Sequence, residues 1–194
     1  MQRARCAVWA RASIHKGKRG VSDLASAYRE IRPPAKRFER SCVSVLLWFV
    51  GRGFQAAAHV DKHVQDEVCG WKDGTIIAIG VAPCGPHMSV RKTGNRLRFL
   101  GNVKAPDADA VIEFKNLDAA LLVLTGQIGI DRAYAEHRFS LKGDLFSIGM
   151  PLVRCLYIVE SYLFPKSIAK KILKRWPKRS SSGFAVYFHT IFGV

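Results

Sequence analysis

The segment "LTGQIGIDRAYAEHRFSLKGD", residues 124–144, decides the fold because its turn and cap residues divide the chain into short, recognisable elements. An apolar helix predicted over 117–125 ends at Gly126, which adopts a left-handed backbone conformation at little cost. Asn116 stands where its side chain can cap the first turn of that helix. The segment therefore begins with the end of a short, capped helix.

A second short helix and a strand complete the segment. Asp131 is a predicted N-cap for a helix that continues to about His137. Phe139 and Leu141 then alternate with polar residues, which indicates a half-buried strand that ends at Gly143. Asp144 follows as a predicted cap for the next helix.

The chain before this segment changes its hydrophobic period once. Apolar residues at three- and four-residue spacing predict one long helix over 36–68, where Gly51 and Gly53 mark a bend or a close packing contact. Period-two alternation then predicts strands at 77–81, 87–92, 96–100 and 110–114, the middle two joined as a hairpin. The order predicts an α+β fold with a mostly antiparallel five-stranded sheet covered by helices on one face.

Features in this order resemble the sterol carrier protein (type 2) lipid-binding domain family over roughly residues 38–150. They are an acidic alternating strand at 109–115, the helix end Leu124-Thr125-Gly126, the helical Ala133 and a strand that closes on Gly143-Asp144. The resemblance implies a sterol-carrier-protein-like fold that encloses an apolar tunnel. It also implies binding or transfer of sterols, fatty acids or other lipids without covalent catalysis, so an enzyme is not expected.

A lipid tunnel needs large apolar side chains whose surface is not consumed by core packing. For each candidate, simple packing in a closed core is the alternative. The predicted lining residues are Ile77, Ile79, Leu97, Phe99, Ile112, Phe114, Leu121, Leu122, Phe139, Leu141, Phe146, Met150 and Leu156.

Positive charge is concentrated at the two ends of the chain. The formal net charge is +16, of which residues 1–40 hold +8, residues 166–194 hold +7 and residues 41–165 only +1. We therefore predict three regions: a basic N-terminal extension at 1–35, a lipid-binding domain at 36–165, and a basic helix with an apolar tail at 166–194. The extension is expected to be disordered or to serve as a basic arm. Residues 1–20 also suit an organellar transit-like segment or sequence translated upstream of the true start.

The basic C-terminal region suits contact with an anionic membrane surface. Alternatively, it is a solvated helix whose tail packs back onto the domain. No apolar run reaches the roughly 20 residues of a membrane span, so a cytoplasmic protein, peripheral at membranes, is expected. The oligomeric state is left open. The predicted membrane-contact residues are Lys170, Lys171, Lys174, Arg175 and Trp176.

Two rival functions come from other classes. The basic ends could serve as nucleic-acid-binding arms, but they carry few aromatic residues for base stacking, so nucleic acid is disfavoured as a partner. Cys84 lies near His87, the pairing that an enzyme acting on a lipid or acyl thioester could use, although the stretch reads as a turn.

A metal site has weak support in the sequence. His59, His63 and Glu67 share one helix face, but a solvated face explains that spacing better than a metal site. No metal and no cofactor are predicted.

Overall fold

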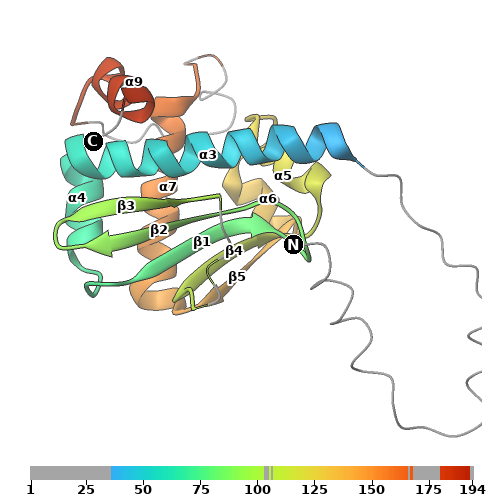
Figure 1. Ribbon diagram of the computed structural model, residues 1–194, viewed down its shortest axis with the longest axis horizontal. Helices are drawn as coiled ribbons and strands as arrows, with labels where there is room; N and C mark the ends of the chain where they lie inside the picture. The colour runs from blue at the N-terminus through green and yellow to red at the C-terminus, as the bar shows by residue number, and fades with distance from the viewer. Residues whose placement is uncertain (1–35, 103–104, 106, 166, 168–179, 193–194) are drawn as a thin grey trace, which may run out of the picture. The chain divides into compact units, whose positions relative to one another are not determined.

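The computed structural model describes residues 36–102, 105, 107–165, 167 and 180–192. Its helices and strands belong to one unit, Arg37–Val194 (Figure 1). The predicted extension at 1–35 and most of the predicted basic helix lie outside the described residues.

A five-stranded mixed sheet forms the base of the domain. The strands are β1 (Ile76–Val81), β2 (His87–Thr93), β3 (Arg96–Gly101), β4 (Ala110–Phe114) and β5 (Phe139–Gly143). Their order in the sheet is β3-β2-β1-β4-β5. Three of the four pairings are antiparallel and β1 pairs with β4 in parallel, so the predicted α+β class is confirmed and the sheet is mixed.

The register places two adjacent rows of apolar side chains across one face of the sheet. Ile79 pairs with Met88 on β2 and with Ile112 on β4. Val81 pairs with Phe114, which in turn pairs with Phe139 on β5. Because alternate residues of a strand face the same side, these residues form the face on which the helices pack.

The described residues form the following helical segments, in chain order: α3 (Arg37–Val60), α4 (Lys62–Cys69), α5 (Leu117–Leu124), α6 (Ile130–Ala135), the π-helix η1 (Leu145–Gly149), α7 (Met150–Leu163) and α9 (Gly183–Phe192). α3 lies along the sheet, and α9 packs on α3 (Figure 1). α7 contacts both α3 and α4.

The prediction of one helix over 36–68 is wrong at a single residue. Asp61 has an extended backbone, with φ −98° and ψ 118°, which separates α3 from α4. Its side chain accepts hydrogen bonds from the amides of His63 and Val64, so it caps α4. Gly51 marks close packing instead of a break, because a Cβ there would lie 2.4 Å from the Phe99 ring.

Asp61 also joins the two ends of the domain. Its carboxylate is fully buried and accepts hydrogen bonds from the Tyr162 hydroxyl of α7 and from the Ser180 amide before α9. Burial by itself raises the pKa of this carboxyl, but the hydrogen bonds, chiefly from Tyr162, outweigh it and hold the pKa below its ordinary value. The carboxylate is therefore charged and satisfied inside the domain.

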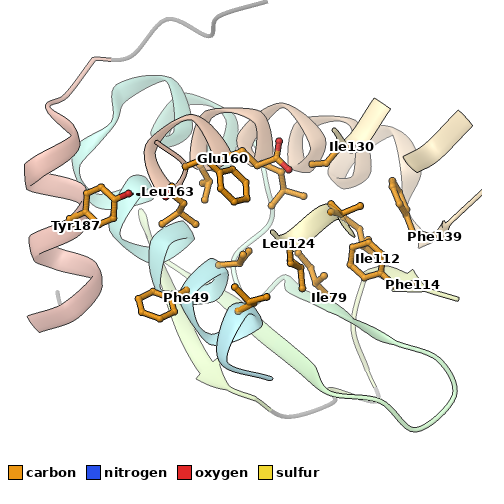
Figure 2. A pocket seen from close by; sticks show the side chains of 16 residues that line it. Phe49, Ile79, Ile112, Phe114, Leu124, Ile130, Phe139, Glu160, Leu163 and Tyr187 are labelled. Atoms are coloured by element: carbon orange, nitrogen blue, oxygen red, sulfur yellow. Dashed lines mark hydrogen bonds between the residues drawn. The ribbon is translucent and has the colours of Figure 1, made fainter. Parts of the chain in front are cut away.

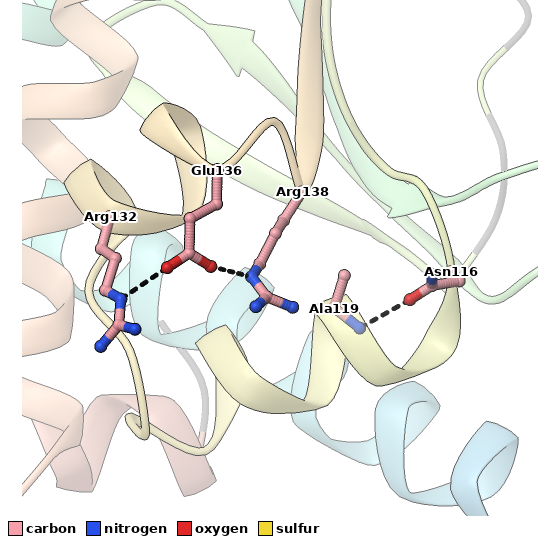
Figure 3. A network of polar contacts seen from close by, with 5 residues as sticks. All are labelled: Asn116, Ala119, Arg132, Glu136 and Arg138. Carbon is pink, nitrogen blue, oxygen red and sulfur yellow. Dashed lines mark hydrogen bonds and ion pairs between the residues drawn. The ribbon is translucent and has the colours of Figure 1, made fainter.

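The helix before Gly126 folds as predicted, and the helix that follows it begins earlier than predicted. The Asn116 side chain accepts from the Ala119 amide at 2.8 Å and caps α5 (Figure 3), and Gly126 has φ +70°. The start of α6 differs, because Ile130 opens the helix and Gly129 is the N-cap, so Asp131 lies in the first turn.

A network of ion pairs follows α6. Glu136 accepts from Arg132 and from Arg138, which connects the end of α6 to the start of β5 (Figure 3). The hydrogen bond from Arg132, followed by that from Arg138, lowers the pKa of the Glu136 carboxyl.

Two spans, Arg37–Val60 and Leu145–Leu163, are long and apolar enough to cross a membrane by length and composition alone. Of their most apolar windows, 44% and 56% are buried inside the domain. Buried core helices meet the same two criteria, so these criteria do not assign either span to a membrane.

Gly143 is required by two separate features of the backbone. Its φ is +99°, and a Cβ there would lie 1.9 Å from the carbonyl oxygen of Asp109. The same oxygen accepts from the Asp144 amide at 3.1 Å, and the Asp144 side chain caps η1 through Ser147. The Gly-Asp pair thus fixes the exit from β5 toward α7.

We expect Gly143→Ala to lower the free energy of unfolding by roughly 3 kcal/mol or more, because it adds a backbone overlap to the strained φ. Gly74→Ala is the matched control, since Gly74 has φ +86° and nothing within 4 Å of a Cβ, and should cost only about 1–2 kcal/mol. Urea denaturation of the two variants measures the difference. Equal losses would show that the contact with Asp109 relaxes without cost.

Candidate functional site

An apolar cavity of about 280 Å³ lies between the sheet and helices α3, α5, α6, α7 and α9 (Figure 2). Almost all of its wall is hydrocarbon. The lining residues are Leu46, Phe49, Val50, Ile79, Ile112, Phe114, Val123, Leu124, Ile130, Phe139, Leu156, Val159, Glu160, Leu163, Phe164 and Tyr187.

Regular secondary structure positions most of this wall. Leu156 lies three and four residues before the adjacent pair Val159 and Glu160, and Leu163 lies four and three residues after them, so all four share one face of α7. On the opposite side, the paired residues of β1, β4 and β5 present their apolar rows toward the same space. The cavity is therefore the part of the core that these two layers leave unfilled.

The cavity opens at the end formed by α3 and α9. Phe49 and Tyr187 line the cavity and are 40% and 41% exposed, whereas Ile112 and Phe114 at the sheet are 4% and 3% exposed. Figure 2 shows these two pairs at opposite sides of the cavity. The Tyr187 hydroxyl donates to the Leu163 carbonyl oxygen at 2.7 Å, which ties α9 to the end of α7 at this mouth.

Among the described residues that line the cavity, Glu160 is the one acidic or basic side chain. It is 9% exposed, and its Oε2 has no hydrogen-bond partner among the residues that the structure describes. Burial, followed by repulsion from Asp131, raises the pKa of its carboxyl to about 8. The Glu160 side chain is therefore predominantly a neutral carboxylic acid at pH 7.

Five predicted lining residues meet in the cavity, and eight lie outside its lining. Ile79, Ile112, Phe114, Phe139 and Leu156 line it. Of the other eight, Phe146 on η1 and Met150 at the start of α7 are 88% and 55% exposed. Leu97 lines a separate cleft together with Arg96 and Arg98. The remaining five belong to the core or pack against it: Ile77, Phe99, Leu121, Leu122 and Leu141.

Of the wall that the helices supply, sequence reasoning predicted Leu156 of α7 and missed the other residues. Leu46 and Phe49 belong to the predicted apolar face of the first helix, but that pattern does not distinguish a face against a core from a face against a cavity. Glu160 carried a usable signal, because it is the only acid in the apolar run "PLVRCLYIVESYLF", residues 151–164. An acid on the buried side of such a helix needs hydrogen-bond partners, so its presence there indicates a polar site.

The described residues include no group of three or more histidine, cysteine, aspartate or glutamate side chains placed to hold a metal ion. Glu67 accepts two hydrogen bonds from Arg154, at 2.6 and 2.7 Å. The ring of His59 lies edge-on to that of His189, with centroids 5.4 Å apart, and His63 is exposed.

The Cys84–His87 neighbourhood lies at the turn into β2. Cys84 is disulfide-bonded, and its carbonyl oxygen accepts from Arg40. The Nδ1 atom of the buried His87 ring is 2.8 Å from the Gly85 carbonyl oxygen. In this state the pair offers no thiol that the imidazole could activate.

The comparison with solved structures returns sterol carrier domains. A UbiJ-SCP2 ubiquinone synthesis protein is 15% identical and matches 66% of this chain and all of its own, with a TM-score of 0.39. Sterol carrier protein 2 from Yarrowia lipolytica, in its apo form, is 16% identical over 60% of this chain and 89% of its own (TM-score 0.40). Sterol carrier protein 2 like 2 from Aedes aegypti is 15% identical over 46% and 86% (TM-score 0.29).

These proteins carry the family name that the sequence resemblance gave. The TM-scores are too low, and the identities too small, for the matches to say what this chain binds. No family model matches the chain, and no curated protein matches it in sequence. We therefore infer the function from the cavity and from the residues that line it.

We expect Glu160 to make the protein less stable as pH rises from about 5 to 8. Its folded pKa of about 8 lies above the ordinary 4.5, so the unfolded chain loses this proton first and higher pH favours unfolding. Relative to Glu160→Gln, the wild-type free energy of unfolding should fall by about 1.4 kcal/mol per pH unit in this window. Urea denaturation of both proteins at several pH values measures the difference.

Glu136→Gln is the control for that experiment. The Glu136 carboxyl has a lowered pKa, so its contribution to the free energy of unfolding is complete at pH values above the ordinary carboxyl pKa. That contribution is lost only at acid pH. Its profile should therefore parallel that of the wild type between pH 5 and 8. A parallel profile for Glu160→Gln as well would contradict a buried, neutral Glu160.

Proposed function

We propose that this protein binds a lipid in the cavity and carries it without covalent chemistry. The observation that supports this most directly is an unfilled apolar volume of about 280 Å³ that opens at one end. For comparison, an engineered apolar cavity of about 150 Å³ remains dry and binds benzene. The resemblance of segment 124–144 to sterol carrier domains supports the same function.

The wall indicates which part of the ligand the cavity accepts. Fifteen of the sixteen lining side chains are aliphatic or aromatic, and the hydroxyl of Tyr187 is already donated to Leu163. Such a wall gains free energy from every methylene that it removes from water, at about 0.8 kcal/mol each. We assign the cavity to the hydrocarbon part of a fatty acid, acyl chain, phospholipid or sterol-like molecule.

The surface beside the mouth supports exchange of that lipid with a membrane. α9 exposes Phe184, Phe188, Ile191 and Phe192, which are 50–81% exposed, and Trp48 of α3 is 36% exposed. Phe188 and Phe192 also contact each other, with ring centroids 4.8 Å apart. Exposed aromatic groups next to the mouth of the cavity can insert into a bilayer surface, where a basic segment adds attraction to anionic headgroups.

The predicted membrane-contact residues, 170–176, lie outside the described residues. Their contribution stays a prediction, as does a cytoplasmic location. α9 provides a surface that can be tested without them.

Filling the cavity should abolish lipid uptake. Val159 lines the cavity and is 1% exposed, so Val159→Phe places extra volume in the unfilled space. We expect the variant to bind the hydrocarbon probe diphenylhexatriene at least about tenfold more weakly than the wild type, with an unchanged or raised melting temperature. Probe fluorescence and calorimetry supply the two measurements.

Val45→Phe is the control, because Val45 is 55% exposed on α3 and is not part of the lining. It should bind the probe as the wild type does. Extraction of the purified wild-type protein with organic solvent, followed by mass spectrometry, identifies any lipid that co-purifies. A wild-type protein that takes up neither probe nor lipid would refute the proposal.

Removal of the exposed aromatic groups of α9 should slow lipid exchange. We expect Phe188→Ser combined with Phe192→Ser to reduce binding to phosphatidylcholine–phosphatidylserine vesicles and transfer of the probe between them by at least about fivefold. Phe146→Ser is the control, since Phe146 is 88% exposed but lies on η1, at the far end of α7 from the mouth. Equal losses in both variants would show that α9 has no special role.

A further inference from the structure

Burial of the Glu160 carboxyl costs free energy. A buried polar atom without a hydrogen bond loses its hydration and gains nothing in return, and such atoms are few in folded proteins. At this position on α7, a leucine would complete the hydrocarbon wall that Leu156, Val159 and Leu163 already form. The Oε2 atom of Glu160 is therefore buried without a hydrogen-bond partner among the described residues.

The position of the carboxyl points to a ligand as that partner. Glu160 lines the cavity and lies on α7 one helical turn before Leu163, which is held to Tyr187 at the mouth. Figure 2 shows its carboxyl on the side of Ile130, away from Tyr187 and Phe49. A molecule that enters from the mouth therefore meets this group inside the cavity.

The surrounding charges restrict the chemistry of the partner. The neighbouring acid is Asp131 of α6, which accepts from the Tyr157 hydroxyl of α7. Among the residues that the structure describes, no lysine, arginine or histidine lines the cavity. An anionic headgroup buried here would have no cation to offset its lost hydration. A neutral carboxylic acid both donates and accepts one hydrogen bond, which complements a hydroxyl group.

We propose that the Glu160 carboxyl is the polar anchor of this cavity, and that the bound lipid carries an uncharged hydroxyl group at its polar end, as a long-chain alcohol does. This inference rests on the proposed lipid-binding function. The hydrocarbon wall binds the tail, and Glu160 selects the end group.

The test compares three ligands that share one hydrocarbon chain: oleyl alcohol, oleate and oleylamine. Each displaces diphenylhexatriene, which has no polar group and therefore reports on the cavity independently of Glu160. In the wild-type protein at pH 7, oleyl alcohol should bind at least about tenfold more tightly than oleate. Glu160→Leu should lower the affinity for oleyl alcohol by about tenfold relative to the affinity of the same variant for diphenylhexatriene.

Glu160→Gln is the conservative variant, because an amide also donates and accepts hydrogen bonds, and it should retain the preference for oleyl alcohol over oleate. Equal binding of oleyl alcohol by the wild type and Glu160→Leu would overturn the proposal and leave the carboxyl as a hydrated or unpaired group. Tightest binding of oleylamine, lost in Glu160→Leu, would overturn it in favour of an ion pair. Failure of diphenylhexatriene itself to bind would instead refute the lipid-binding function.

Discussion

The buried carboxylate of Asp61 is the constraint on which the arrangement of the helices depends. A charge inside a protein must be satisfied by fixed donors, and here the donors come from α4, α7 and the segment before α9. Ser181 adds a hydrogen bond from its hydroxyl to the Val60 carbonyl oxygen, at 2.5 Å. These segments are therefore held together at the end of α3, and the space between α3 and α7 is set from that point.

α3 contacts both the closed core and the cavity. The second half carries small buried residues, Gly51, Gly53 and the run Ala56 to Ala58, and a Cβ on Gly51 would overlap the Phe99 ring of β3. Leu46, Phe49 and Val50, which come just before Gly51 in α3, line the cavity. Small residues allow close approach to the sheet, whereas large ones hold the helix away from it. α3 therefore lies close to β3 at Gly51, whereas the larger side chains just before that glycine line the open volume.

Two buried acids of the domain, Asp61 and Glu160, differ in their hydrogen bonding. Asp61 is a buried acid with its partners in place, so it contributes to the structure. Glu160 is a buried acid whose Oε2 lacks a partner among the described residues, at the wall of an open volume. The contrast lies in hydrogen bonding, because both side chains are buried. An unsatisfied group at a cavity wall is a reason to look for a ligand, and a satisfied one is not.

The sequence by itself determined the local elements: the five strands, the caps at Asn116 and Asp144, the left-handed Gly126 and the Gly-Asp exit from β5. These depend on neighbouring residues, so pattern and turn chemistry suffice to predict them. Tertiary structure alone decided the parallel pairing of β1 with β4, the break of the first helix at Asp61 and the membership of the cavity wall. Periodicity shows which face of an element is apolar, but only the distance between layers decides whether that face meets a packed core, as at Ile77, or an open volume, as at Phe49. The same distance decides that Glu160 faces a cavity and not water.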